Sequence, residues 1–443
     1  MVLRPFRARG GRSLRYFLED WDQPLIGEGR LQWPAKTTDE SCFDDLRPDT
    51  RVDLKCLLVT ESMDASGMDE FVAFLARELP SSGIETAILL CSDSPGWREG
   101  ALFDALRGEG VRVASVGESE GEGWIRAFQP DVLYAHGATE WPLNVAAAEG
   151  IPAIEALHGM HNLFNTAAND RERRRAFLHG TVAVSDLVRT QYLHLHPDVG
   201  ERDVITIANG INGQRLPSVS SADSRAALGL RDEYLFVSLS RYSVQKNVYA
   251  LIDGFLEAAR ERPEIHLLVC GRMDDEDYTG QILALRDRSP YSNRVHLRAG
   301  TERIDVILAA ANAFVLDSFF EGWSLASMEA LGAGVPVVLS DVGGAREQLA
   351  DGPARGVLIS NPLGDALEVD WKTMSAARFA RQSNRAELVA ALLSMADGSL
   401  RLADRDEIAA YARARYGDEQ CLQAHAAVIR RAAQGVPVAE DEH

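Results

Sequence analysis

From Asp53 onward, short apolar runs alternate with segments of helical spacing, and this alternation restricts the possible folds more than any other feature of the chain. Leu54–Val59 is typical of a buried strand, Met68–Leu79 has apolar residues at helical spacing, and Glu85–Leu90 is the next strand. Strands that alternate with helices of about ten residues predict βαβ units and a mainly parallel sheet. The same pattern predicts strands at Val111–Val116, Val132–Ala135, Ala153–Leu157 and Val182–Ser185, and helices at Trp97–Arg107, Pro142–Glu149, Asp170–Leu178 and Leu187–Leu193.

A second alternating series starts at Leu235 and stops near residue 365, so the chain should contain two α/β domains. The break between the series, Ser218–Ser224, has the composition of a linker. Each half reads as a Rossmann-like, doubly wound parallel-sheet domain, and we expect the ligand in the cleft between them. The predicted order is an extension without its own core (1–52), an N-terminal domain (53–217), a C-terminal domain (225–403), a helix that packs back on the N-terminal domain (404–432) and a tail (433–443).

Composition excludes several classes of protein. A net charge of −20 disfavours nucleic acid and anionic membranes as partners, and peripheral membrane contact is not favoured either. No run reaches the roughly 18 apolar residues of a membrane span, and the basic N-terminus lacks the apolar stretch of a secretory signal. The cysteines are odd in number and never spaced Cys-x-x-Cys, which suits the cytoplasm and argues against a disulfide framework or structural zinc. They are Cys42, Cys56, Cys91, Cys270 and Cys421.

Residues 317–349 are the most informative for function. Two carboxylates, Glu321 and Glu329, stand eight positions apart around a loop-to-helix junction that begins with Gly322, and Gly343-Gly344 follow the next strand. We expect the amides at the helix start and at Gly343-Gly344 to face an anionic ligand, and the glutamates can accept hydrogen bonds from hydroxyls. A nucleotide-sugar offers both a diphosphate and hydroxyls. Ordinary helix-terminus glutamates and a common Gly-Gly turn remain an alternative at this point.

A pair of cations follows the first strand of the second half. Arg241 and Lys246 lie five residues apart on one loop and can straddle a diphosphate, the arginine as a bidentate donor and the lysine as a point charge. In a chain this acidic, a phosphate-bearing ligand depends on such a local cluster. Two exposed basic residues without a ligand are the alternative.

The first half offers weaker candidates. Gly67 follows the first strand, and His158 ends the strand at 153–157, where it could hydrogen-bond a sugar; a structural histidine is the alternative. His158 and His161 have no further ligand nearby, so we expect no metal site. Arg171–Arg175 is a dense basic run, read as a solvated helix face, with contact to a phosphorylated or membrane-borne acceptor as the alternative.

Together these motifs resemble the retaining GT-B glycosyltransferases of family 4, over residues 53 to about 425. The resemblance is strongest at Glu321-x7-Glu329 with Gly332-Ala-Gly334-Val-Pro336 and Asp341-Val-Gly343-Gly344. Ser240-Arg241-x4-Lys246-Asn247 is similar to the family's Gly-Arg-x4-Lys-Gly element. The further matches are Ala183-Val184-Ser185, Asn209-Gly210-Ile211 and Leu157-His158-Gly159.

The resemblance implies a hexose-type transfer from a nucleotide-diphosphate sugar to a hydroxyl acceptor, without metal or resident cofactor. A UDP-sugar is the expected donor, with GDP- or ADP-sugars as alternatives. Arg241 and Lys246 would hold the diphosphate, and Glu329 would accept from the ribose hydroxyls. Catalytic residues would be His158, Arg241, Lys246 and Glu321, with donor contacts also from Gly67, Arg272, Gly322, Trp323, Ser324, Leu325 and Glu329.

Three features depart from the family pattern. The N-terminal loop has the single glycine Gly67 where two are common, Gly271-Arg272 replaces Gly-Asp-Gly near the nucleotide base, and the arginine-bearing lead before residue 53 has no counterpart. A dinucleotide oxidoreductase is disfavoured, because the Gly-x-Gly-x-x-Gly motif that it needs does not occur in this sequence. Two alternatives stay open: a nucleotide-sugar epimerase or hydrolase of the same fold, and a non-catalytic partner subunit.

Overall fold

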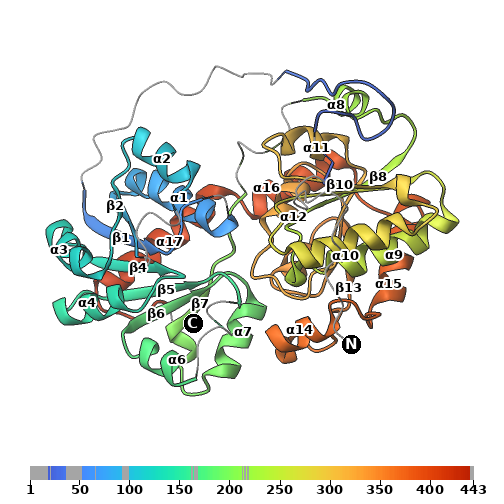
Figure 1. Cartoon of the computed structure of the whole chain (residues 1–443). Coiled ribbons are helices and arrows are strands. Elements are labelled where there is room, and N and C mark those ends of the chain that lie inside the picture. The colour runs from blue at the N-terminus through green and yellow to red at the C-terminus, as the bar shows by residue number, and fades with distance from the viewer. Residues whose placement is uncertain are drawn as a thin grey trace. The chain divides into compact units, whose positions relative to one another are not determined.

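The computed structural model describes residues 18–19, 21–35, 52–64, 66–91, 99–160, 163, 168–211, 213, 216 and 219–439. The contacts divide these residues into two units (Figure 1). The N-terminal unit consists of residues 52–210 and 416–439, and the C-terminal unit consists of residues 18–35 and 211–415. The chain therefore passes from one unit to the other three times, and each unit is built from discontinuous segments.

The N-terminal unit contains a seven-stranded sheet in the order β3-β2-β1-β4-β5-β6-β7, with every neighbouring pair parallel. The order reverses between β1 and β4, as in a doubly wound fold. Its strands are β1 (Leu54–Thr60), β2 (Ile84–Leu90), β3 (Val113–Ser115), β4 (Val132–His136), β5 (Ala153–Leu157), β6 (Leu178–Ala183) and β7 (Val204–Thr206). Its helices are α1 (Gly67–Glu78), α2 (Ala101–Gly108), α3 (Glu118–Phe128), α4 (Trp141–Glu149), α6 (Ala168–Arg175), α7 (Asp186–Leu195) and α17 (Asp418–Ala433).

The C-terminal unit contains a six-stranded parallel sheet in the order β10-β9-β8-β11-β12-β13. Its strands are β8 (Tyr234–Leu239), β9 (Ile265–Cys270), β10 (Val295–Arg298), β11 (Ala313–Leu316), β12 (Val337–Ser340) and β13 (Gly356–Ile359). Its helices are α8 (Ser221–Ala227), α9 (Val248–Glu261), α10 (Glu276–Asp287), α11 (Ile304–Ala310), α12 (Leu325–Gly332), α13 (Ala345–Leu349), α14 (Trp371–Ala377), α15 (Arg385–Ala396) and α16 (Arg405–Arg415). The two parallel-sheet units confirm the predicted fold class.

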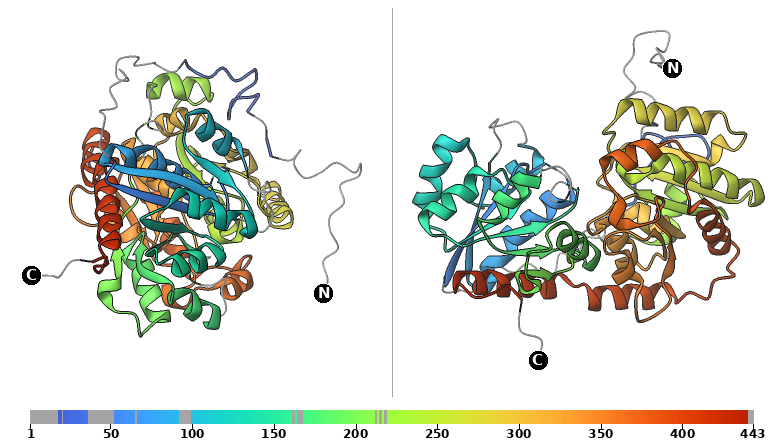
Figure 2. Two further views of the ribbon diagram at one scale, coloured as in Figure 1. Left: turned by 90° about the vertical axis from the view of Figure 1, so that its left-hand side faces the viewer. Right: turned by 90° about the horizontal axis from the view of Figure 1, so that it is seen from below.

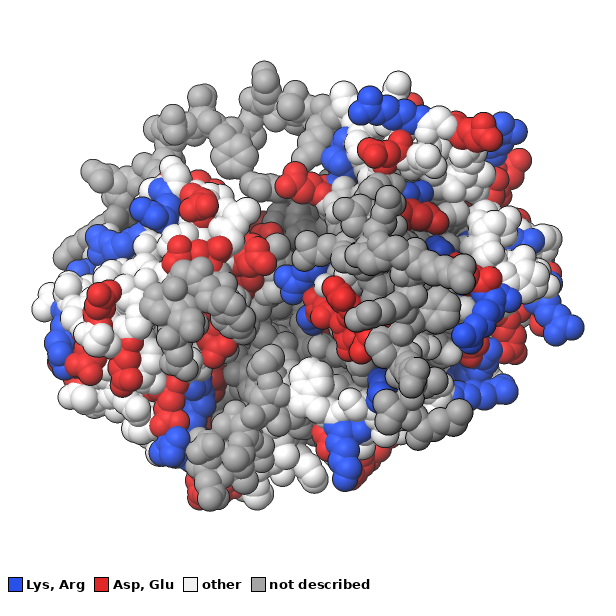
Figure 3. Space-filling view, viewed as in Figure 1, with Lys and Arg blue, Asp and Glu red and all other residues white. Residues whose placement is uncertain are grey.

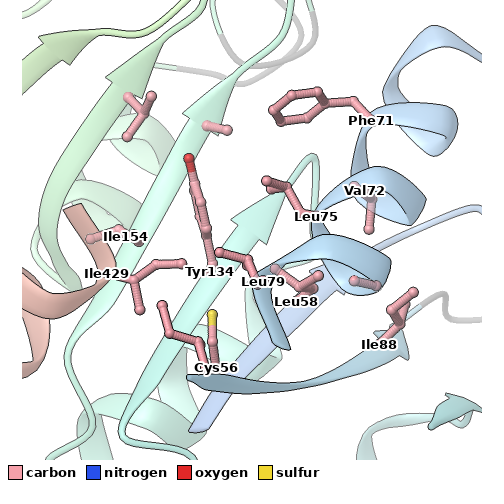
Figure 4. Close-up of a cluster of buried hydrophobic side chains, with 14 of the residues drawn as sticks. Cys56, Leu58, Phe71, Val72, Leu75, Leu79, Ile88, Tyr134, Ile154 and Ile429 are labelled. Atoms are coloured by element: carbon pink, nitrogen blue, oxygen red, sulfur yellow. The ribbon is translucent and has the colours of Figure 1, made fainter. Parts of the chain in front are cut away.

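The core of the N-terminal unit depends on a helix from the far end of the sequence. α17 packs against β4 and β5, and in Figure 2 (right) it runs along the sheet of this unit. Figure 4 shows its Ile429 beside Tyr134 and Ile154 of the sheet, and the cluster continues to Phe71 of α1. The single helix expected over 404–432 is two helices, because α16 ends before Gly417 and belongs to the C-terminal unit.

Residues 18–35 lie on the edge of the other sheet. The Glu19 amide donates to the Leu297 carbonyl (3.1 Å), so the segment extends the ladder beyond β10, and the Leu25 amide donates to the Leu228 carbonyl (2.9 Å). Leu18, Leu25 and Leu31 are buried. The segment lies beside α8 in Figure 1, where it is dark blue. The sheet edge that it covers would otherwise expose unpaired amides and carbonyls.

The local structure differs from the sequence prediction at β6, at Ser218–Ser224 and at α3. β6 covers Leu178–Ala183, whereas the sequence predicts a helix that continues to Leu178 and a strand that begins only at Val182. Ser218–Ser224 was expected as a linker, but Ser220 caps α8 by accepting from the Asp223 amide, so serine here starts a helix. α3 was not predicted because Gly121 and Gly123 interrupt its helical pattern. A Cβ on Gly121 would overlap the Trp141 ring, so this glycine serves the close packing of α3 on α4.

Candidate functional site

The loop between β8 and α9 carries both predicted phosphate-binding cations. Lys246 Nζ lies 2.7 Å from both carboxylate oxygens of Glu321, and Ser318 Oγ donates to the same carboxylate (2.6 Å). Glu321 is only 6% exposed, so the ion pair is shielded from bulk water. Two residues that the sequence places 75 positions apart thus form one charged pair at the carboxyl ends of β8 and β11.

Asp317 fixes the end of the Lys246 loop. Its two carboxylate oxygens accept from the side-chain amides of Asn247 (3.1 Å) and Asn384 (2.7 Å). Asn247 adopts a left-handed conformation (φ 50°), which turns the chain from Lys246 into α9. Burial raises the pKa of Asp317 to about 7, against the lowering effect of the two amide donors. No pattern in the sequence marks Asp317 or Asn384 as site residues.

The shifted pKa of Asp317 predicts a pH-dependent stability. Between the ordinary aspartate pKa of about 3.9 and pH 7, the folded chain keeps a proton that the unfolded chain loses, so the stability falls as the pH rises. We expect the melting temperature of Asp317→Asn to depend less on pH in this range than that of the native chain. Asp104→Asn, which changes an exposed carboxylate, should keep the native pH dependence. An unchanged slope in Asp317→Asn would contradict the assignment.

A second carboxylate organises the arginines. Asp274 accepts from Arg241 and, at 3.0 Å, from Arg272 Nε, so two predicted donor-binding arginines converge on one acid. The loops that carry them are close because Gly271 packs on the Ser240 carbonyl, where a Cβ would overlap the oxygen. Asp274 was missed because one more acid in an acidic chain carries no distinguishing pattern.

The junction at α12 matches the predicted arrangement of carboxylates. Glu321 lies on the loop before the helix, Ser324 caps it by accepting from the Ser327 amide (3.2 Å), and Glu329 falls in its second turn, 5% exposed. Trp323 is buried just before the cap, and Leu325 is the first helical residue. A small pocket at this junction is lined by residues that include Glu321, Ser324, Ser327, Ser340 and Gln348.

The amides of Gly343-Gly344 were expected to face a ligand, and for Gly344 this is wrong. The Gly344 amide donates to the Gly322 carbonyl (3.1 Å), so the two glycine turns bind each other. Gly343 has a φ of 48°, and a Cβ there would overlap the Gly322 carbonyl. A Cβ on Gly344 would overlap the Trp323 ring. These glycines therefore allow two loops to approach closely.

This packing predicts opposite effects of the same substitution at two glycines. Gly344→Ala should destabilise the C-terminal unit by about 1–3 kcal/mol, because the new methyl group displaces the buried Trp323. Gly280→Ala in α10 has no neighbouring atom within 4 Å and should stabilise by roughly 0.5–1 kcal/mol. Urea unfolding of both variants measures the difference, and equal stabilities would refute the packing argument.

In the N-terminal unit, His158 follows β5 and its Nε2 lies 2.9 Å from Nδ1 of His136. Burial lowers the pKa of His158 to about 4, so the imidazole is neutral at neutral pH. Gly67 is exposed at the start of α1, which Ser66 caps. The preceding loop is shaped by the buried Asp69, which accepts from Ser62 Oγ (2.8 Å) and the Asp64 amide (3.0 Å). His158 and Gly67 belong to a different unit from the other site residues.

The basic run of α6 is paired with acids. Arg173 binds Glu140 (2.7 Å) and Arg175 binds Asp198, while Arg174 forms a largely buried pair with Glu155 (2.7 Å). Acidic and basic side chains are interspersed over the described face in Figure 3. The Arg173 and Arg175 pairs favour the solvated-face interpretation over an anion-binding site, whereas Arg174 is a buried structural partner of Glu155. His161 lies outside the described residues.

The described part of the chain lacks two kinds of feature. No group of three or more His, Cys, Asp or Glu side chains there could hold a metal ion. None of its helices has both the length and the apolar character required to cross a bilayer.

Known proteins match both halves of the chain. The family description "Glycosyl transferases group 1" matches residues 220–373, and "Glycosyltransferase Family 4" matches residues 65–215. A D-inositol 3-phosphate glycosyltransferase of Frankia alni is 26% identical over 340 residues, which are 67% of this chain and 83% of that protein. A glycogen synthase of Mycobacterium tuberculosis is 26% identical over 264 residues, 57% of this chain; the matched region spans 60% of the synthase.

Solved structures agree on the fold. Anabaena HepE, solved with UDP and glucose, has a TM-score of 0.64 at 17% identity, over 84% of this chain and 98% of its own. A glycosyltransferase of Rickettsia africae has a TM-score of 0.65 at 14% identity, and the match covers 86% of this chain and 98% of that protein. With two parallel-sheet units and family matches on both, the chain belongs to the family 4 glycosyltransferases of the GT-B fold.

Proposed function

We propose that this glycosyltransferase moves a hexose from a nucleotide-diphosphate sugar to a hydroxyl acceptor, with retention of anomeric configuration. The observation that carries the proposal is the shielded Lys246–Glu321 pair at the strand ends of the C-terminal unit, beside two arginines that share Asp274. The cations of this cluster can bind a diphosphate in place of their carboxylate partners. The carboxylates can then accept hydrogen bonds from sugar hydroxyls. The UDP and glucose bound by HepE support a UDP-sugar as the donor.

In the proposed step, the bond between the anomeric carbon and the diphosphate oxygen breaks while the acceptor oxygen bonds to the same face of that carbon. The acceptor proton passes to the departing diphosphate, so no protein nucleophile is required. Arg241 and Lys246 stabilise the charge that develops on the diphosphate. Glu321 accepts from hydroxyls of the transferred sugar, and Glu329 accepts from the ribose.

Donor contacts also come from Arg272, Gly322, Trp323, Ser324 and Leu325 in this proposal, and from Gly67 in the N-terminal unit. No metal or resident cofactor takes part in the proposed step. The names of the relatives include inositol phosphate and glycogen as acceptor or product, so the acceptor is proposed only as a hydroxyl. We propose the cytoplasm as the location; the described cysteines are free thiols.

The first test is a thermal-shift screen against UDP, GDP, ADP, dTDP and their sugar conjugates, without added metal. A ligand at about 100 times its dissociation constant stabilises by about 2.7 kcal/mol. We expect one nucleotide to give a clear shift that Glu329→Ala loses. No shift with any of them would favour a partner subunit that keeps the fold.

Product analysis separates the remaining rival. The donor that binds is incubated with and without candidate hydroxyl acceptors, and the anomeric configuration of the product is read by NMR. Free sugar or an epimer formed without an acceptor would favour the hydrolase or epimerase reading. An inverted product would refute retention while leaving glycosyl transfer in place.

A further inference from the structure

His136 and His158 form an imidazole pair at the carboxyl ends of two neighbouring strands of the N-terminal sheet. His136 is the last residue of β4, and His158 directly follows β5, its parallel neighbour. The carboxyl ends of adjacent parallel strands meet at the same edge, and this brings His136 Nδ1 within 2.9 Å of His158 Nε2. The pair therefore uses one nitrogen of each ring, and Nδ1 is the nitrogen of His158 that lies outside the pair.

The surroundings of the pair are aromatic. The ring centroids of Tyr134 and His136 are 4.3 Å apart, and those of Phe71 and His158 are 5.4 Å apart. The Tyr134 hydroxyl also forms a hydrogen bond with Nδ1 of His425 in α17 (2.9 Å). Burial lowers the pKa of His136 well below its ordinary value, and His158 is affected in the same direction. Both rings are therefore neutral at neutral pH, and one proton lies between them.

Two arrangements of the protons are possible. If His158 Nε2 donates, His136 must carry its own proton on Nε2, and His158 presents a bare Nδ1. If His136 Nδ1 donates, His158 carries its proton on Nδ1 and presents an N–H group. His136 Nε2 decides between them, because it is fully buried and has no hydrogen-bond partner among the described residues. A buried N–H without a partner is rarer than an under-used acceptor, which favours donation by His136.

We propose that His136 is a positioning residue that holds His158 in the Nδ1–H tautomer, so that His158 offers its ligand a donor and not a base. The consequence for catalysis rests on the proposed function; the tautomer itself does not. A donor suits a hydroxyl oxygen of the transferred sugar. It is also consistent with the proposed step, in which the departing diphosphate takes the acceptor proton and no histidine base is needed.

Histidine nitrogen NMR tests the tautomer directly. In the full-length chain labelled with ¹⁵N-histidine at pH 7.5, we expect a pyrrole-type Nδ1 and a pyridine-type Nε2 for His158, assigned by loss of its signals in His158→Gln. His266 and His296 supply an internal reference, because their Nδ1···Nε2 distance is 3.0 Å in the other unit. A pyrrole-type Nε2 on His158 would overturn the proposal.

Substitutions of His136 separate positioning from folding. His136→Asn can keep a donor near the Nδ1 position and should preserve the His158 tautomer, whereas His136→Leu removes the donor and should change the tautomer populations. Removing one oriented donor costs about 10²-fold in well-studied enzymes, so we expect His136→Leu to lower kcat about tenfold or more with little change in the KM for the donor. His296→Leu is the matched control that breaks the other pair and should leave kcat unchanged.

The outcomes are distinguishable. A wild-type chain that shows the predicted tautomer but transfers no sugar would refute the proposed function and keep the inference about His136. A His136→Leu variant with the native tautomer of His158, or with kcat lowered no more than in His296→Leu, would refute the inference and keep the proposed function.

Discussion

Lys246→Ala is expected to lower kcat/KM by about 10²–10³-fold, the range found when one preorganised donor to a developing oxyanion is removed. Lys246 lies 2.7 Å from both oxygens of Glu321 and is the cation that we propose to meet the departing diphosphate. The loss should appear mainly in kcat if Lys246 acts on charge that develops in the transition state. Steady-state kinetics with the donor identified by thermal shift measure it.

The same substitution also changes stability, and this effect must be separated from catalysis. Without Lys246, the largely buried Glu321 loses its counter-ion, and breaking a buried pair costs up to about 3–5 kcal/mol. The double variant Lys246→Met with Glu321→Gln removes both charges and should recover stability without recovering activity. Arg303→Ala is the matched control, because the Arg303–Asp305 pair has side-chain exposures of 17% and 8%, against 16% and 8% for Lys246–Glu321. Near-native rates in Lys246→Ala would refute the site assignment.

Ile429→Ala should destabilise the N-terminal unit by about 2–5 kcal/mol, the range for truncating a large buried aliphatic side chain. Ile429 is fully buried in the cluster that joins α17 to β4 and α1. The effect should be confined to one unit, so a single unfolding transition is a poor measure of it. Amide hydrogen exchange is the better readout: β4 should lose protection while β8 keeps it.

Val436→Ala provides the control for Ile429, because Val436 is exposed and follows the same helix. Its stability should stay within about 0.5 kcal/mol of the native chain. Equal loss of protection in β4 and β8 after Ile429→Ala would show that the two units unfold together, and would contradict the separate cores described above.

The fold could be predicted because its sheets are parallel and buried on both faces. Strands such as Leu54–Thr60 are therefore nearly continuous apolar runs, and the helices between them keep an apolar stripe. The helices α3 and α8 were not predicted, because a close helix contact and a serine cap stabilise them and neither gives an apolar pattern in the sequence. Gly121 lowers the helical signal of α3 but allows contact with Trp141, and the serines before α8 resemble a loop because serine serves both loops and caps.

The sequence could indicate the charged residues of the candidate site but not the groups that orient them. Arg241, Lys246, Glu321 and Glu329 could be singled out by their spacing, and the structure places the first three near the ends of neighbouring strands; their role in binding a ligand stays a prediction. The groups that orient them were not predictable. Asp317 contacts Asn247 and Asn384 across 70 and 67 positions of sequence, and such pairings depend on strand order and not on local pattern. The hydrogen bond from the Gly344 amide to the Gly322 carbonyl likewise depends on how the two loops fold, and no local sequence pattern indicates it.

The exchange of segments between the two units has a consequence for synthesis on the ribosome. The sheet of the N-terminal unit is translated first, but its core lacks Leu422, Val428 and Ile429 until α17 has emerged. The C-terminal unit needs residues 18–35 and 211–415, so it has all of its segments before α17 is made. The half that is translated second can therefore complete its fold first, while the earlier half exposes an apolar face that chaperones would recognise. A chain that ends at Arg415 and has been released from the ribosome should thus hold one finished domain and one unfinished domain.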